Sequence, residues 1–275
     1  MNGGSNGAPE SSAPPRSEEI QREGLLQRFP LIVFLAPLFV YLGLAGFEPR
    51  PPGPDELFWE DTSPGEWFGI PHGYEHYPIY YTARIGLTVL TVWLVSPGFR
   101  YFPRKIGWLG MVVGAVGVVV WVGVCKLDLE QLIFVPIGLG SFLGLGERAA
   151  FNPFEMMANN LPWMYTFLAI RFFGLAAVVP LIEEMMVRGF LMRYLVDQQW
   201  WKLPIGTVNR AAIVAPAIYG ALTHPAEMFA AILWFSMVTW LAIKTRNIWE
   251  CVVAHAVTNL LLGIYVITWN DWAMW

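Results

Sequence analysis

Charged residues are scarce in this 275-residue sequence, at 14% of the chain, whereas hydrophobic residues make up 56%. A soluble domain normally carries about a quarter charged residues, so too few are present to cover a globule that faces water on every side. This scarcity excludes an ordinary cytosolic enzyme and predicts a membrane protein. Basic residues are also few, with 17 Lys and Arg against 21 acidic residues, so the sequence predicts no nucleic-acid partner.

Cysteine is nearly absent as well. Cys125 and Cys251 both lie within apolar stretches, where a free thiol behaves as a small hydrophobic group. Two such residues do not provide the framework of a secreted disulfide-rich domain, and that class is excluded.

Long apolar runs, in contrast, are abundant. About 20 apolar residues cross the roughly 30 Å hydrocarbon core of a bilayer as a helix. Such runs predict an all-α fold, a polytopic helical membrane bundle of about seven to eight transmembrane helices, over 29–47, 79–96, 106–125, 171–196, 211–225, 228–243 and 249–268. The shorter run 132–146 contains one proline and four glycines and is interpreted as a re-entrant piece or a broken span. Gly110 and Gly114 lie four residues apart, which suits close packing of two helices.

The chain is expected to divide into a tail and two membrane regions. Residues 1–27 are rich in Gly, Ser, Pro and Glu and predict a disordered tail, without the pattern of a signal peptide. Residues 28–150 form an N-terminal transmembrane region, and residues 151–275 form the transmembrane region that carries the candidate catalytic groups.

Lysine and arginine in the short loops indicate the orientation. The segment 46–81 contains a single basic residue, Arg50, against seven acidic residues. Basic residues instead gather in three other loops: Arg100, Arg104, Lys105, Lys202, Arg210, Lys244 and Arg246. This pattern predicts that these three loops and the N-terminus are cytoplasmic and that the Trp-rich segment 269–275 lies outside or at the interface.

Ionisable side chains within apolar runs are the first candidates for function, because each costs at least about 2.5–3.5 kcal/mol to insert. Glu184 and Arg188 are four residues apart and are expected to pair on one helix face, which leaves Glu183, turned about 100° away, available as a general base for water. The alternative is a helix end whose acids reach interfacial water. Arg84 and Arg171 are expected to extend to the interface without a further role.

Two histidines and an amide follow in later apolar runs. His224 precedes Pro225, and its alternative role is that of an interfacial residue. His255 and Asn259 are four apart on one face of the last run, and their alternative role is a hydrogen-bonded clamp between helices. At 1.5 Å per residue, these groups and Glu183 lie at comparable depth, which predicts one buried, wet cavity. This similarity in depth weakens if a helix over 161–182 ends just before the glutamates, because they would then lie near the cytoplasmic surface.

A carboxylate, two imidazoles and an amide around water can perform hydrolysis. The carboxylate takes the proton of the water, one imidazole positions that water, and the other imidazole and the amide stabilise the oxyanion. Glu183, His224 and His255 are also a familiar type of zinc ligand set. A divalent metal such as zinc is compatible with the sequence but is not required by it, because no His-Glu-x-x-His motif is present.

At these residues the chain resembles the CAAX-prenyl-protease-like intramembrane protease family, also called CPBP or Abi, which includes the Rce1-type proteases. The family's Glu-Glu-x-x-x-Arg motif is matched by Glu183, Glu184 and Arg188, and its His-x-x-x-Asn motif by His255 and Asn259. Its Phe-x-x-x-His motif is matched only at His224, because Gly220 stands four residues before it and the aromatic Tyr219 five before it.

The resemblance covers about 172–266 and implies a helical bundle with an intramembrane cavity that hydrolyses peptide bonds. It implies Glu183 as the base, His224 on the water, His255 and Asn259 at the oxyanion, and Glu184 with Arg188 in support. The segments 203–207 and 255–266 look closest to a bacterial subgroup found beside exosortase sorting systems, which implies an integral protein of the bacterial inner membrane.

The leading hypothesis is therefore an intramembrane endopeptidase in the lipid bilayer that acts on a membrane protein or peptide. A proton-coupled transporter is one alternative, and it predicts an internal repeat between two halves of the chain, which the sequence does not show. A non-catalytic membrane scaffold or immunity-type protein is the other, and it would tolerate loss of the His224 side chain.

Overall fold

The computed structural model describes residues 28–49, 73–102, 105–140, 145 and 150–274. The described residues form helices and connecting loops, without a strand. The predicted tail, residues 1–27, lies outside the described residues. The prediction of an all-α polytopic bundle is confirmed.

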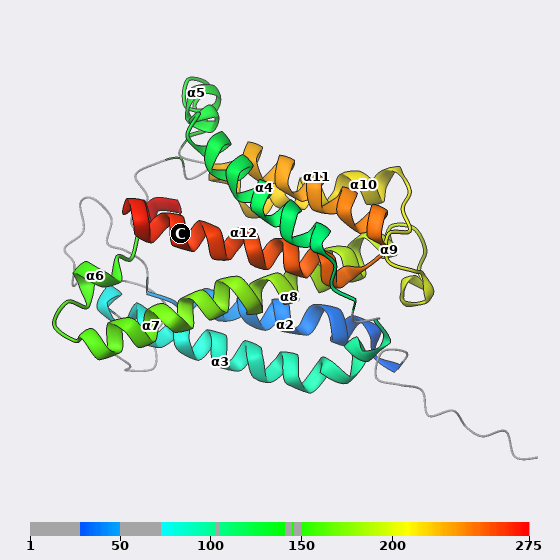
Figure 1. Ribbon diagram of the computed structural model, residues 1–275, viewed down its shortest axis with the longest axis horizontal. Helices are drawn as coiled ribbons and strands as arrows, with labels where there is room; N and C mark the ends of the chain where they lie inside the picture. Colours follow the sequence, from blue (N-terminus) through cyan, green and yellow to red (C-terminus); the bar gives the residue numbers. More distant parts are fainter. Residues whose placement is uncertain (1–27, 50–72, 103–104, 141–144, 146–149, 275) are drawn as a thin grey trace, which may run out of the picture.

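Among the described residues, the apolar helical segments run roughly alongside one another (Figure 1). Their bounds are α2 Pro30–Ala45, α3 Tyr77–Val95, α4 Trp108–Cys125, a continuous segment Leu161–Tyr194, α10 Arg210–Thr223, α11 Met228–Thr245 and α12 Ile248–Trp269. Five of the helical segments are long and apolar enough to cross a membrane, and α2 and α10 are shorter apolar helices. Together, these five long and two shorter apolar helices of the described residues are consistent with the predicted bundle of about seven to eight spans.

The segment Leu161–Tyr194 changes its helical type along its length. It begins as α7 Leu161–Phe173 and continues through a π-helical segment Gly174–Val178, α8 Val179–Glu184, a second π-helical segment Met185–Leu191 and α9 Met192–Tyr194. The Asn160 side chain accepts a hydrogen bond from the Trp163 backbone N–H at 3.3 Å and caps the start of the segment. The prediction of a span over 171–196 is therefore wrong at its beginning, which lies ten residues earlier.

The run 132–146 does not form a span of its own among the described residues. The short helix α5 Leu129–Phe134 follows α4 and ends in turns, and a second short helix, α6 Pro153–Met156, precedes α7. Residues 141–144 and 146–149 lie outside the described residues, so the described part contains only the short α5 piece of this run.

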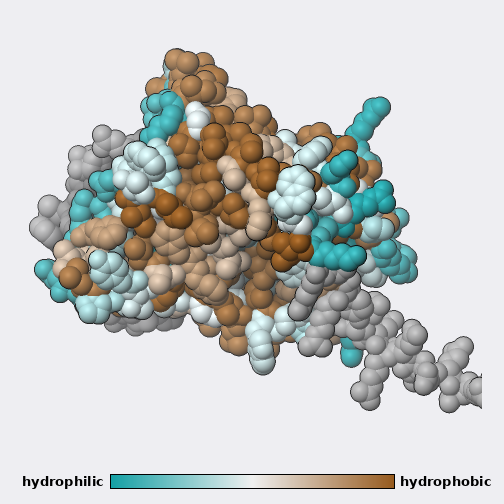
Figure 2. Space-filling view, in the orientation of Figure 1, coloured by the Kyte–Doolittle hydropathy of each residue, from teal (hydrophilic) through white to brown (hydrophobic). Residues whose placement is uncertain are grey.

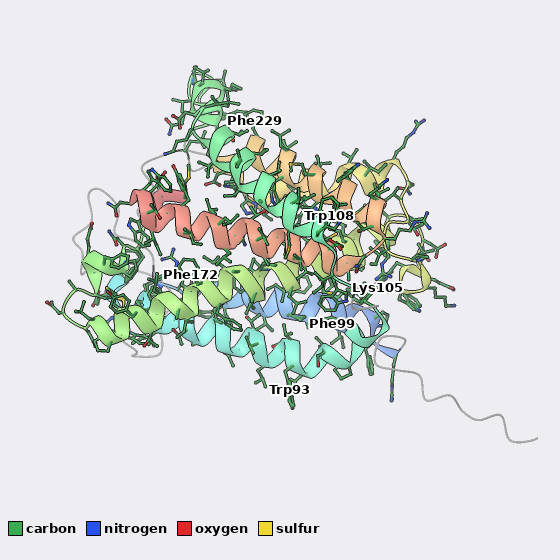
Figure 3. The ribbon with its side chains drawn as sticks, viewed as in Figure 1. Trp93, Phe99, Lys105, Trp108, Phe172 and Phe229 are labelled. Carbon is green, nitrogen blue, oxygen red and sulfur yellow. The ribbon has the colours of Figure 1, made fainter. Side chains whose placement is uncertain are left out.

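The apolar side chains that face outward form a belt around the bundle. Figure 2 shows a broad hydrophobic zone across the middle of the molecule, flanked by hydrophilic groups at both ends. Trp93, Val119 and Leu222 are each more than two-thirds exposed. Figure 3 shows Trp93 pointing away from the neighbouring helices. Exposed apolar surface of this extent is unfavourable in water, so we infer that lipid surrounds the belt.

Glycines allow α4 to pack directly against α12, as the spacing of Gly110 and Gly114 predicts. A methyl group added at Gly114 would lie 2.5 Å from the backbone oxygen of Ala254 on α12. The buried Glu250 side chain of α12 accepts hydrogen bonds from the backbone N–H groups of Gly107 and Gly110 at the start of α4. Its carboxylate thus interacts favourably with the positive end of the helix dipole.

The two arginines expected to reach the interface are instead buried. Arg84 forms an ion pair with Glu48 at 3.0 Å between Nε and Oε1, and its guanidinium lies 4.4 Å from the ring centre of Tyr41. Arg171 donates to the Phe151 carbonyl oxygen at 3.2 Å. Burial raises the pKa of the Glu48 carboxyl to about 7 despite the neighbouring Arg84. Tertiary partners therefore satisfy these charges within the protein.

Candidate active site

The two glutamates lie on α8, between the two π-helical segments. Glu183 is 7% exposed and Glu184 is completely buried. Departures from α-helical geometry of this kind are frequent at functional sites, because they change the direction of the side chains that follow. The irregular helix thus presents two adjacent carboxylates to different surroundings.

Glu184 and Arg188 form the ion pair that their spacing predicts. Arg188 Nη1 donates to Glu184 Oε1 at 2.8 Å, and its Nη2 donates to the backbone oxygen of Phe235 at 3.0 Å. The guanidinium also lies 5.0 Å from the centre of the Phe235 ring. Both members of the pair are buried, so each compensates a charge that would be costly alone.

The same carboxylate holds His255 of α12. His255 Nδ1 lies 3.1 Å from Glu184 Oε1, which assigns the Nδ1–H as the donor. The other ring nitrogen, Nε2, then lies 3.6 Å from Oε2 of Glu183. Trp234 packs against the imidazole in an edge contact at 4.5 Å between ring centres. Glu184, itself paired with Arg188, therefore orients His255 so that its Nε2 faces Glu183.

Glu183 has a second partner that the sequence motifs do not include. The Tyr219 hydroxyl of α10 donates to Glu183 Oε1 at 2.8 Å. This hydrogen bond occupies one carboxylate oxygen and leaves Oε2 on the side of His255. The only sequence signal for Tyr219 was an aromatic residue one position away from that of the Phe-x-x-x-His motif.

Packing against α11 explains the displaced aromatic residue. A methyl group added at Gly220 would collide with the Phe235 ring. Phe235 also contacts the rings of Tyr219 and His224, with centres 5.5 Å and 6.2 Å apart. Phe235 thus fills the space beside Gly220, and the aromatic ring of α10 stands on the adjacent face, where its hydroxyl reaches Glu183.

His224 and Asn259 lie at other positions around the same space. His224 follows the last residue of α10, with its Nδ1 3.0 Å from the Thr223 hydroxyl and its ring 5.4 Å from that of Trp121. The Asn259 amide donates to the Leu175 carbonyl oxygen at 2.8 Å, within the first π-helical segment. This bond between helices is the clamp that the sequence left open as an alternative, and it uses one of the two amide hydrogens.

These groups line one cavity of about 540 Å³ inside the bundle. Its polar lining comprises Tyr41, Glu183, Tyr219, Thr223, His224, Glu227, His255, Thr258 and Asn259, and its apolar lining includes Leu38, Leu42, Trp121, Val179, Trp234 and Leu262. Four of the five predicted catalytic residues therefore share a cavity. Glu184 does not line it and lies behind His255. Glu227, like Tyr219, was not among the residues selected from the sequence.

The three candidate metal ligands from the sequence, Glu183, His224 and His255, are not gathered into one group. Among the residues that the structure describes, no group of three or more His, Cys, Asp or Glu side chains is placed to hold a metal ion. Glu183 and His255 are neighbours, but His224 does not complete a three-ligand set with them. The site therefore provides a carboxylate and imidazoles around a cavity, and metal analysis of the purified protein would test the divalent metal that the sequence allows but does not require.

The fold and the cavity define a class of protein, namely a polytopic helical membrane protein with a buried carboxylate–imidazole site. Residues 165–261 match the family described as "Type II CAAX prenyl endopeptidase Rce1-like". This part of the chain is Rce1-like, and the resemblance drawn from the motifs is confirmed. Neither a curated protein nor a solved structure matches the chain, and the exosortase-associated subgroup stays a prediction.

Proposed function

We propose that the protein is an intramembrane endopeptidase, which hydrolyses a peptide bond of a membrane-associated protein with Glu183 as the general base. The observation that supports this most strongly is the pair formed by Glu183 and His255, with Oε2 and Nε2 3.6 Å apart at the wall of a buried cavity. A water molecule can lie about 2.8 Å from both atoms at once. The Rce1-like match over residues 165–261 independently favours peptide-bond hydrolysis.

In this mechanism Glu183 removes a proton from the water as its oxygen attacks the carbonyl carbon of the substrate. Glu183 then passes the proton to the leaving nitrogen, so one carboxylate serves as base and acid in turn. His255 orients the water through Nε2, because its Nδ1–H is held by Glu184. Tyr219 directs the carboxylate by binding its other oxygen.

Asn259 and His224 are the groups assigned to the oxyanion. The Asn259 amide retains one hydrogen beyond the bond to Leu175, and it faces the cavity. The Thr223 hydroxyl donates its hydrogen to the Tyr219 carbonyl oxygen at 2.9 Å, so the His224 Nδ1–H donates to the Thr223 oxygen, and His224 donates from Nε2 as well when its ring is doubly protonated. Donors of this kind stabilise the negative charge of a tetrahedral intermediate. The resemblance placed His224 on the water and His255 at the oxyanion, whereas the contact with Glu183 favours His255 on the water.

The decisive experiment compares Glu183→Gln with wild type in cells that express each protein at equal abundance. New protein N-termini are identified by mass spectrometry of the membrane fraction. We expect a set of new N-termini with wild type that disappears with Glu183→Gln, because an amide cannot accept the proton of the water. Glu155→Gln, an exposed glutamate on α6 outside the cavity lining, is the matched control and should keep the full set.

If Glu183→Gln yields the same new N-termini as wild type, the proposed mechanism is wrong. If neither protein yields new N-termini while Glu183→Gln retains every function of wild type in the cell, the scaffold interpretation is favoured instead.

A further inference from the structure

The two ends of the bundle carry opposite charge among the described residues. Lys105, Lys202, Arg210, Lys244 and Arg246 lie in the loops and helix ends at one end, together with one exposed acidic residue, Asp197. Glu48, Glu75, Asp128, Glu155, Glu227 and Asp271 lie in those at the other, where Lys126 is paired with Asp271 at 2.6 Å. Figure 3 labels Lys105 near the start of α4 and Phe229 near the far end of the same helix. By the positive-inside rule, the basic end faces the cytoplasm.

The cavity extends from Glu183 and His255 toward the acidic end only. On α12 its lining begins at His255, continues through Asn259 and Leu262, and resumes at Ala273 and Met274 beyond the end of the helix. At 1.5 Å per residue, His255 lies about 10 Å from the start of α12 at the basic end and about 21 Å from its other end. The cavity therefore reaches the end of the bundle that is farther from His255.

The other helices contribute in the same direction. α10 lines the cavity with Tyr219 and Thr223, close to its end at the acidic side, and α11 with Trp234 and Phe235, in its first half. Glu227, in the connection between these two helices, also lines it. The cavity therefore lies in the part of the bundle that leads to the acidic loops.

Closely packed apolar side chains close the space between the site and the basic end. Met186 and Val187 follow the glutamates, Val238 and Leu241 follow Phe235, and Cys251 precedes His255. These five side chains belong to one core cluster, and each is less than a tenth exposed. Water or a peptide coming from the basic end would have to displace this core.

We propose that the cavity is reached from the non-cytoplasmic side of the membrane and that its substrate is a membrane-anchored polypeptide segment presented from that side. This inference rests on the proposed function for the nature of the ligand, whereas the direction of access rests on the lining, the core and the loop charges alone. The segment enters beside Glu227, Ala273 and Met274 and extends along α12 to the glutamate. The bond is then cut about 20 Å inside the protein, nearer the cytoplasmic than the non-cytoplasmic end.

Cysteine labelling from each side of the membrane tests this inference. In a Cys125→Ala background, the remaining Cys251 is completely buried, so the parent protein should stay unlabelled. Leu262→Cys places a thiol in the cavity, and Lys202→Cys places one at the exposed basic end. Each variant is treated with a membrane-impermeant cationic methanethiosulfonate, once in bacterial cells with a permeabilised outer membrane and once in inverted membrane vesicles. Labelling is measured by intact-protein mass spectrometry.

We expect the Leu262→Cys thiol to react in cells at least 10-fold faster than in inverted vesicles, and the Lys202→Cys thiol to show the reverse preference. Labelling of both thiols from the same side would overturn the inferred direction of the cavity. Labelling of the Lys202→Cys thiol from outside would overturn the orientation, and a Leu262→Cys thiol that reacts from neither side would show that the cavity has no open path.

The labelling does not depend on catalysis, so its outcome is separable from that of the proposed function. Glu183→Gln combined with Leu262→Cys should label from the same side as Leu262→Cys alone. A protein without protease activity can still show this sidedness, and an active protease can fail to show it.

Discussion

At the scale of single residues, the site depends on how two adjacent carboxylates are distinguished. Glu184 contacts Arg188 and His255 through Oε1, whereas Glu183 receives a hydrogen bond from Tyr219 and faces the cavity. The difference arises from partners on two other helices, α10 and α12, and from Arg188 one turn further along the same segment, and not from the glutamates themselves. Two predictions test these separate roles.

Removal of the Tyr219 hydroxyl should slow catalysis without weakening substrate binding. Hydrogen bonds to charged groups contribute about 1.5–3 kcal/mol, so Tyr219→Phe should lower kcat on the order of 10- to 100-fold. KM should change little, because the aromatic ring stays in the cavity wall. The measurement is steady-state cleavage, in detergent, of a peptide taken from a site found in the N-terminus experiment.

Tyr41→Phe is the control for this variant, because Tyr41 is another tyrosine of the same cavity wall. It should leave kcat within about twofold of wild type. An increase in KM with unchanged kcat for Tyr219→Phe would show that the hydroxyl serves binding and does not orient Glu183.

Replacement of Arg188 by methionine should destabilise the fold, because Glu184 would then be a buried carboxylate without its cationic partner. Breaking a buried pair in this way costs about 3–5 kcal/mol. The double variant Glu184→Gln with Arg188→Met removes both charges and should recover part of the loss. Thermal unfolding of the purified proteins in one detergent provides the comparison. Equal stability of Arg188→Met and wild type would contradict the assigned pairing.

At the scale of elements, helices were predicted well where apolar length alone defines them, and less well where a charge interrupts the run. The runs 106–125 and 249–268 correspond closely to α4 Trp108–Cys125 and α12 Ile248–Trp269. The predicted span with the glutamates, 171–196, begins at Arg171, which was expected to reach the interface. The structure buries that arginine against the Phe151 carbonyl oxygen, a partner 20 residues away.

The contact between α4 and α12 offers a test at this scale. Gly114→Ala should destabilise the protein by about 1–3 kcal/mol, because the added methyl would lie 2.5 Å from the Ala254 backbone oxygen and the helices must move apart. Gly123→Ala in the same helix is the matched control, because nothing lies within 4 Å of its added methyl. It should be neutral or slightly stabilising, since alanine is the better helix former.

Thermal unfolding in detergent again provides the measurement. If both alanine variants unfold at the same temperature, close packing at Gly114 does not determine the stability of this contact.

At the scale of the whole molecule, the bundle combines a core that is closed toward the basic end with a cavity that leads to the acidic end. The apolar belt in Figure 2 keeps both features within the bilayer. If the proposed access is correct, water and substrate enter from one side only and the packed core preserves the permeability barrier. The labelling experiment above addresses this property directly.

The sequence by itself determined that the protein lies in a membrane, where its helices are, and which ionisable residues lie within those apolar helices. These features follow from composition, from the length of apolar runs and from spacings of three to four residues, all of which are local. Only the tertiary structure decided that Tyr219 binds Glu183, that Phe235 occupies the space beside Gly220, and that the cavity leads toward the acidic loops. These outcomes depend on which faces of separate helices meet, and side-chain volume and interhelical contacts determine that choice.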